Sequence, residues 1–220
     1  RCESDILREF QKSPTIVNSG LNTFADVANI DAIMDDYGVP MDGQRCLAIT
    51  PQQMVSLAAA LTNVFPTEIA TRAIERALVA TMGNLPLYKT QSAQAHTVGP
   101  EVSVAIVVDG AQENDYTTVK DNDYLSGTLA VAGLTASITD TLLVGDTFTI
   151  AGVQQVNHRT RQPVGRLQSF SVVANATSDA GGLATLTISP ALITSGPYQT
   201  VYVDGGGTLV PDGSVVTLTA

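Results

Sequence analysis

The period of the apolar residues changes near residue 92, and this change limits the possible folds more than any other feature. Before it, apolar residues recur every three or four positions, as in helices; after it, they alternate with a period of two, as in strands. The 220 residues, 44% of them apolar, are enough for two buried cores. We therefore expect an α+β protein with an α/β region to about residue 91 and an antiparallel β region after it.

The first region carries clear helix signals. Thr23 can cap a helix in which Val27, Ile30 and Met34 form one apolar face, and Gly38 can end it. Residues 45–49 resemble a short buried strand, and the following "TPQQ" supplies an N-cap, a proline at the first helical position and a capping-box glutamine. This second helix should run to about residue 61. We expect a third helix after Pro66 and a strand over residues 87–89.

The second region contains short runs rich in Val, Ile and Thr, separated by Gly, Asp and Pro. One stretch, "LLVGDTFTIAGVQQV" at residues 142–156, has the pattern of strand, tight turn and strand. Regular spacing of such runs indicates a small antiparallel barrel or sandwich. The expected strands are residues 102–108, 127–132, 147–153, 169–175, 183–189, 199–203 and 214–219.

Composition excludes several classes of protein. The net charge of −10 disfavours a nucleic-acid reader. No apolar run approaches the roughly 20 residues of a membrane span, and no signal segment opens the chain. Cys2 and Cys46 are too few for a disulfide scaffold or a four-thiolate zinc site, and we expect free thiols rather than a pair. A chain that starts at Arg1 and ends in a strand-like run is expected to be a fragment of a longer protein.

Candidates for catalysis are few. His96 lies in a small, polar linker and His158 in a basic loop, and we expect both to be solvent-facing rather than ligands or bases. Asp121 and Asp123 have a spacing found in calcium loops, but the glycine and the terminal glutamate of an EF-hand are absent. A solvated hairpin loop is the favoured interpretation. We therefore expect no catalytic, cofactor or metal site.

Two charged segments are the remaining candidates for function. The stretch 109–127 is acidic, whereas three of the four Lys and Arg residues after residue 95 gather in 154–168. Opposite charges on two loops of one small domain suit contacts between copies, although two unrelated exposed loops would give the same pattern. The candidate contact residues are Asp109, Glu113, Asp115, Asp121, Asp123, His158, Arg159, Arg161 and Arg166.

Several motifs, in one order, resemble the coat proteins of P22-like short-tailed phages. In the β region these are Gly145-Asp146 at a turn, Ala151-Gly152-Val153 at the end of the next strand, and "SFSVV" after a polar loop. Upstream, "FADVANIDAIMDDYGVPMDGQRCLAITPQQM" and "ERALVATMGNLPLYKT" are similar to the passage of that family into its inserted domain. The resemblance covers most of residues 20–203.

The resemblance implies a structural subunit of an icosahedral capsid, not an enzyme. It implies a partial apical domain of the HK97-type capsid fold at residues 1–91, with 1–19 a remnant of an upstream helical region, an inserted antiparallel β-barrel at 92–203, and a strand at 204–220 that returns to the apical domain. In this family one loop of the insertion reaches a neighbouring capsomer across a two-fold axis and another lies near contacts within its own capsomer. Residues 109–123 and 154–168 match these loops by position.

The same resemblance implies many copies arranged in capsomers, a scaffolding protein, a portal, and packaged DNA that is enclosed without sequence-specific binding. It places the protein in the virion, after assembly in the host cytoplasm, without a membrane. The residues alone leave two alternatives open. One is a β-rich cell-surface adhesion module that presents loops to a ligand. The other is a hydrolase with Asp109 and Glu113 as an acid pair, which would need a concave pocket.

Overall fold

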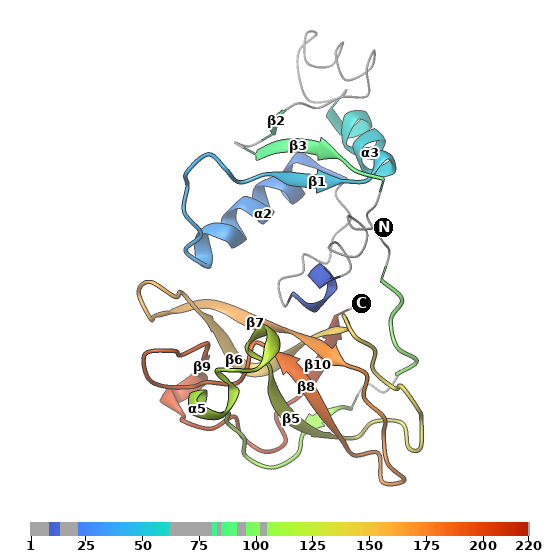
Figure 1. Ribbon diagram of the computed structural model, residues 1–220, viewed down its shortest axis with the longest axis vertical. Coiled ribbons are helices and arrows are strands. Elements are labelled where there is room, and N and C mark those ends of the chain that lie inside the picture. Colours follow the sequence, from blue (N-terminus) through green and yellow to red (C-terminus); the bar gives the residue numbers. More distant parts are fainter. Residues whose placement is uncertain are drawn as a thin grey trace. The chain divides into compact units, whose positions relative to one another are not determined.

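The structure is a computed structural model that describes residues 9–13, 22–61, 81–82, 85–91, 96–101 and 105–219. The chain divides into two compact units (Figure 1). Residues 22–61, 81–82 and 85–91 belong to the first unit, and residues 9–13, 96–101 and 105–219 belong to the second. Among all these residues, no helix is long and apolar enough to cross a bilayer.

The first unit begins with α2 (Phe24–Asp36), which has the boundaries that its sequence predicts. Thr23 and Asp26 form a capping box: each side chain accepts a hydrogen bond from the backbone N–H of the other residue. At the other end, Gly38 has a φ of 73°, and Val39 N–H donates to the carbonyl of Met34. This bond closes a Schellman motif, and glycine fits its left-handed position without strain.

A short sheet and a second helix complete the described part of the first unit. The strand β1 (Leu47–Ile49) lies parallel to β3 (Leu85–Lys89), and β2 (Thr81–Met82) is antiparallel to β3. The helix α3 (Pro51–Leu61) starts at the predicted cap, where Thr50 N–H donates to Oε1 of Gln53 at 3.1 Å. The helix expected after Pro66 lies outside the described residues. The core consists of Val27, Ile49, Met54, Leu57, Ala58, Leu85 and Leu87.

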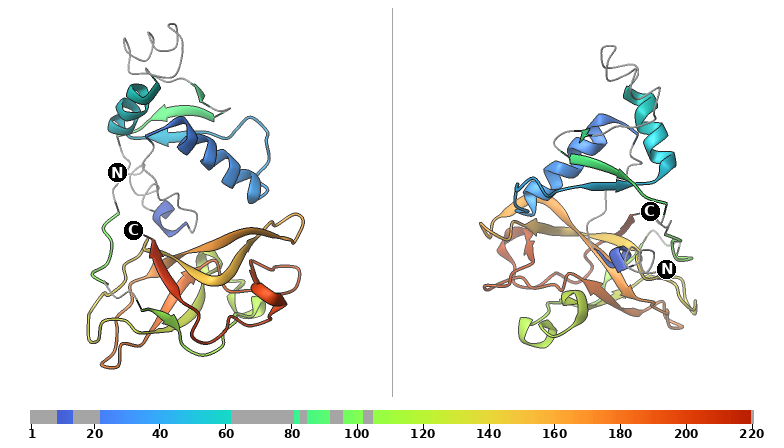
Figure 2. Two further views of the ribbon diagram at one scale, coloured as in Figure 1. Left: turned by 180° about the vertical axis from the view of Figure 1, so that it is seen from behind. Right: turned by 45° about the horizontal axis from the view of Figure 1, so that its top comes forward.

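The second unit is built on a curled antiparallel sheet, which Figure 2 shows from two further sides. The order of its main path is β10-β6-β7-β8-β5-β4. Strand β9 pairs with the later part of β6, after the stretch of β6 that pairs with β10. The strands are β4 (Val107–Val108), β5 (Gly127–Ala132), β6 (Thr147–Val156), β7 (Pro163–Ala174), β8 (Ala184–Ser189), β9 (Val201–Val203) and β10 (Val216–Thr219). Of the predicted run 102–108, only β4 is a strand, and 102–104 lie outside the described residues.

The hairpin of β6 and β7 is longer than the sequence predicts. Residues 154–168 were expected to be a loop because they are polar, yet Gln154 pairs with Leu167 and Val156 with Pro163. Strand β9 also pairs with β6 over Val153–Gln155, so this part of β6 has a hydrogen-bonding strand on each side. A polar sequence can therefore remain in strand conformation here. Only residues 157–162 form the turn between the two strands.

The two ends of the sheet are joined by hydrogen bonds. Val107 forms a bridge with Val215, Val108 N–H donates to the Ser214 carbonyl, and Val216 N–H donates to the Ile106 carbonyl. Strand β10 itself pairs with β6. The expectation that 204–220 returns to the first unit was therefore wrong: Val216 is buried in the core of the second unit, where its strand finds partners on both sides.

Residues 9–13 also differ from expectation, because they belong to the second unit rather than to the domain predicted for 1–91. The short helix η1 (Phe10–Lys12) lies against β7, where Ser171 Oγ donates to the Lys12 carbonyl at 2.6 Å. Glu9 forms an ion pair with Lys12 and accepts a hydrogen bond from the Tyr124 hydroxyl. These side chains hold the segment on the sheet, and nothing in the local sequence indicates that contact.

Candidate intersubunit contact surface

The acidic segment, residues 109–127, contains the short helix α5 (Tyr116–Val119). Asp115 caps it, since its carboxylate accepts hydrogen bonds from Thr117 N–H at 3.0 Å and Thr117 Oγ1 at 2.7 Å. These bonds, the side-chain one first, lower the pKa of Asp115, so that it is charged at neutral pH. All five predicted carboxylates are exposed: Asp109, Glu113, Asp115, Asp121 and Asp123.

Asn114 fixes the acidic segment to the loop between β8 and β9, residues 190–200. Its N–H donates to the Leu192 carbonyl at 2.8 Å, its Oδ1 accepts from Leu192 N–H at 2.9 Å, and its Nδ2 donates to the Thr128 carbonyl at 3.1 Å. A Cβ on Gly127 would lie 2.1 Å from Asn114 Oδ1, so only glycine leaves room for this arrangement. The sequence separation of 78 residues explains why sequence reasoning missed it.

Two tyrosines join the same two segments from outside. The rings of Tyr116 and Tyr198 are stacked, with centroids 3.6 Å apart and an interplanar angle of 7°. Tyr198 is 51% exposed. The pKa of Tyr116 is raised, first by the hydrogen bond with the Tyr198 side chain, so the phenol is neutral at physiological pH. Neither tyrosine was among the predicted site residues, because their partnership arises only from the fold.

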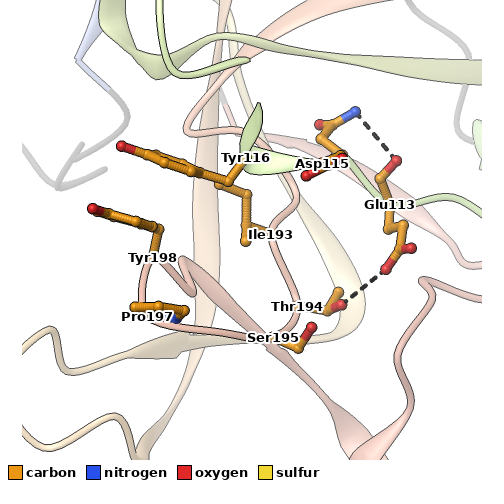
Figure 3. Close-up of a pocket in the computed structure, with 9 residues that line it drawn as sticks. Glu113, Asp115, Tyr116, Ile193, Thr194, Ser195, Pro197 and Tyr198 are labelled. Carbon is orange, nitrogen blue, oxygen red and sulfur yellow. Dashed lines mark hydrogen bonds between the residues drawn. The ribbon is translucent and has the colours of Figure 1, made fainter. Parts of the chain in front are cut away.

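A pocket of about 340 Å³ lies beside the tyrosines (Figure 3). Thr194 Oγ1 donates to Glu113 Oε2 at 3.3 Å on one wall, and Tyr116 and Tyr198 form another. Asp109 does not line the pocket, so the acid pair considered for a hydrolase is not assembled there. The lining residues are Glu113, Asn114, Asp115, Tyr116, Ile193, Thr194, Ser195, Pro197 and Tyr198.

The basic turn, residues 157–162, stands at the end of the β6–β7 hairpin and carries Arg159 and Arg161, and Arg166 follows in β7. Asn157 Oδ1 accepts hydrogen bonds from the N–H groups of Arg159 and Thr160, which stabilises the tip. Arg161 Nη1 donates to the Gln199 carbonyl at 3.4 Å, immediately after Tyr198 in the chain. The basic turn and the acidic segment therefore both contact one loop, the β8–β9 connection. The side chains of His158, Arg159, Arg161 and Arg166 are all exposed.

The two histidines differ in their exposure to solvent. His158 is exposed, as expected, and its pKa is lowered, first by partial burial and then by the charge of Arg161. For His96 the expectation of a solvent-facing side chain was wrong. Its Nε2 lies 2.7 Å from Asp146 Oδ1, and its side chain is only 27% exposed. Because His96 and Asp146 are 50 residues apart in the chain, local spacing could not predict this pair.

Metal binding finds no support in the described part of the chain, where no three His, Cys, Asp or Glu side chains are placed to hold an ion. Cys46 is an exposed free thiol. What the second unit presents is a curled sheet with charged and aromatic groups gathered on loops at one end, beside a small pocket. Such a surface suits contacts between proteins better than it suits catalysis.

Comparison with known proteins identifies the class as phage coat proteins. The family described as "P22 coat protein - gene protein 5" matches residues 10–203, so the chain belongs to the P22 coat protein family. It is a structural subunit of a bacteriophage capsid, and the family implies assembly from many copies and a place in the virion. Nothing supports the alternative of an adhesion module.

A solved structure, the "CUS-3 coat protein I-domain", is similar to part of the chain. It is 27% identical, and the match covers 53% of this chain and 96% of that one, with a TM-score of 0.35. No curated protein matches the sequence.

Proposed function

We propose that the two units are two parts of an HK97-type coat protein. The first unit would be part of the apical domain, and the second the inserted β-barrel. The helix, strand and helix order of residues 24–61 supports the first assignment. The second is supported by the hydrogen bonds that join β4 to the segment before β10, because they link the two ends of the curled sheet.

The charged loops of the second unit are the proposed contacts between copies. Asp121 and Asp123 are exposed in the acidic segment, and Arg159 is exposed at the tip of the hairpin. Exposed pairs of this kind contribute little singly, about 0–1 kcal/mol. In a closed shell each contact recurs many times, and multivalency converts weak contacts into a stable object. The barrel would also stabilise the subunit through its own core.

Assembly would take place in the host cytoplasm with a scaffolding protein and a portal, and the shell would enclose DNA without reading its sequence. The net charge of −10 is compatible with the last point, because acidic proteins repel phosphate groups, but many acidic proteins never meet DNA and the charge does not decide it. Each of these partners follows from the family and awaits its own test.

The observation that carries this proposal is the family match over residues 10–203. The experiment is electron microscopy of the intact gene product, expressed together with its neighbouring genes. We expect closed particles of uniform diameter. A product that stayed monomeric or formed small oligomers under all these conditions would overturn the proposed assembly.

A further inference from the structure

A row of hydroxyl side chains crosses the curled sheet from β10 to β8, on the face opposite the core. Paired in register across neighbouring strands, its members are Thr219, Thr147, Ser171 and Ser189. Phe148 and Phe170 lie beside it along the chain and belong to the core, and successive side chains of a strand point to opposite faces. Hydroxyls on an outer face usually meet water, yet Ser171 is 0% exposed and Thr147 and Ser189 are each 4% exposed. This row is therefore covered by another part of the chain.

Residues 9–13, which we call the strap, lie on the middle of this row. Ser171 Oγ donates to the Lys12 carbonyl at 2.6 Å. The strap is also held by Tyr124, whose hydroxyl donates to the Glu9 carboxylate and whose ring centroid lies 5.1 Å from Lys12 Nζ. A cation at this distance from an aromatic ring is attracted to its face. The strap therefore has two separate supports on the second unit, the hydroxyl row and Tyr124.

The backbone around Tyr124 is strained. Tyr124 and Leu125 have φ values of 59° and 49°, in the left-handed region that residues other than glycine rarely adopt. Ser189, a member of the row, donates from Oγ to the Tyr124 carbonyl at 2.8 Å and so stabilises this conformation. Strain of this kind persists where the surrounding structure fixes it, often at clamps and switch regions. Here it accompanies the contact of Tyr124 with Glu9, as a clamp for the strap requires.

The strap meets the linker into the second unit at Gly145. A Cβ on Gly145 would lie 3.3 Å from the Cβ of Gln11 in the strap and 3.0 Å from Nδ1 of His96 in the linker. Between these two residues the chain forms the first unit, to which all described residues from 22 to 91 belong. Both ends of that stretch therefore lead to one place on the second unit.

The two ends are held with unequal strength. At the linker, His96 and Gly99 bind the carboxylate of Asp146, whose side chain is 2% exposed. In the strap no residue is fully buried, and Phe10 is 67% exposed. Segments with few buried contacts open at a smaller free energy than the whole fold does, and water can then replace their hydrogen bonds. The strap should therefore open before the linker does.

We propose that the strap is a releasable latch of the second unit. Closed on Gly145 and Tyr124, it fixes both ends of the chain of the first unit. Open, it leaves that chain fixed at the linker alone, so the two units turn more freely relative to each other. This inference does not depend on the capsid function, because all of its contacts lie within one copy of the chain.

A disulfide across the closed latch tests the first part of this proposal. The Cβ of Gln11 and a Cβ on Gly145 lie 3.3 Å apart, close to the separation of about 3.5–4.5 Å in disulfides. In the full chain, with Cys2 and Cys46 replaced by serine, we expect mild oxidation to join Gln11→Cys and Gly145→Cys in most molecules. Gel mobility without reductant and mass spectrometry measure the cross-link.

Gly165 supplies the control, because its φ of 81° is also left-handed and nothing lies within 4 Å of a Cβ placed there. Gln11→Cys with Gly165→Cys introduces a comparable backbone strain and should stay reduced. A cross-link in both variants, or in neither while circular dichroism shows a folded chain, would overturn the closed latch.

Release of the latch is measured in a second variant, which leaves the turn before β6 unchanged. Ser171→Ala with Tyr124→Phe removes two hydroxyls that hold the strap. Spin labels are attached at Val55→Cys in the first unit and Leu183→Cys in the second, both exposed, in the same background without the native cysteines. We expect a wider distribution of distances between the labels, measured by electron paramagnetic resonance, and faster hydrogen exchange of the strap amides.

The matched control is Ser169→Ala with Tyr202→Phe. Ser169 lies on the same strand and face as Ser171, and Tyr202 lies on β9, so two hydroxyls are again lost from the sheet. The distance distribution and the exchange of the strap should both stay unchanged. Equal widths in the two variants would overturn the latch. Both measurements use the unassembled chain, so a failure to form shells would overturn the proposed function and leave this result standing.

Discussion

Nε2 of His96 lies 2.7 Å from Oδ1 of Asp146, a carboxylate whose side chain is only 2% exposed. The same carboxylate accepts hydrogen bonds from the backbone N–H groups of Gly99 and Leu143. One buried side chain thus holds the entry of the chain into the second unit and the turn before β6. A buried polar side chain is tolerated when its atoms are hydrogen-bonded, and both oxygens of this carboxylate have partners.

The first prediction concerns this carboxylate. Asp146→Ala leaves the Gly99 and Leu143 N–H groups without their acceptor, at a cost of about 1–3 kcal/mol for an unsatisfied buried group. We expect the free energy of unfolding of the second unit, measured in denaturant, to fall by roughly that amount. The matched control is Asp121→Ala, which removes an exposed carboxylate and should change stability little. Equal effects of the two substitutions would contradict the role given to Asp146.

Gly127 provides a second prediction, on packing. A Cβ at this position would lie 2.1 Å from Asn114 Oδ1 and 2.9 Å from the Cβ of Ala191. Gly127→Ala must therefore displace the side chain that ties the acidic segment to the β8–β9 loop. Overpacking of this kind costs about 1–3 kcal/mol. Hydrogen exchange should show faster exchange at Leu192 N–H, whereas Thr128→Ala, at the next and exposed position, should leave it unchanged.

Local signals predicted the described helices of the first unit well. Thr23, Asp26 and Gly38 set the ends of α2 through bonds within a few residues, and these bonds are visible in the sequence as a capping box and a C-terminal glycine. In the second unit the alternation of apolar residues located most strands. It could not show that β10 pairs with β6, because pairing between distant strands leaves no local pattern.

Only part of the candidate surface could be predicted from the sequence, because contacts between distant segments again leave no local pattern. Charge alone located the acidic segment and the basic turn. The groups that join the acidic segment to the β8–β9 loop, Tyr116, Tyr198 and Asn114, have partners about 80 residues away and no distinctive local context. Their roles follow from tertiary contacts only. The His96–Asp146 pair was missed on the same grounds.

Arg45 gives a third prediction, in the first unit. Its guanidinium donates to Asp31 and Asp35 at 2.7 Å each and to the Val39 and Pro40 carbonyls, while its side chain is 7% exposed. Arg45→Lys keeps the charge but loses the forked geometry. We expect a thermal midpoint of the first unit lower by a few degrees and faster hydrogen exchange in residues 39–45. Lys89→Ala, which changes an exposed cation in the same unit, is the control.

His158 allows a prediction of pH dependence. Partial burial, and then the charge of Arg161, lower its pKa below the ordinary value of 6.5. The unfolded state therefore binds the proton more tightly, and protonation destabilises the folded hairpin as the pH falls below about 6.5. Arg161→Gln should raise the pKa of His158, measured by NMR titration. Arg166→Gln serves as the comparison, and a pKa that stayed fixed in Arg161→Gln would exclude the charge of Arg161 as a cause.

The last prediction tests the charged loops as contacts between copies. Asp121→Lys with Asp123→Lys reverses two exposed charges on the acidic segment without touching the core. If these carboxylates meet cations of neighbouring copies, reversal replaces attraction by repulsion, and shells should form less efficiently or dissociate at lower denaturant. The defect should shrink as ionic strength rises, because salt screens exposed charges. The control for net charge alone replaces four exposed neutral residues outside both charged segments, which changes the charge by the same amount: Ala136→Lys, Thr139→Lys, Ala180→Lys and Thr185→Lys. Shells of unchanged stability in the first variant would remove Asp121 and Asp123 from the contact surface.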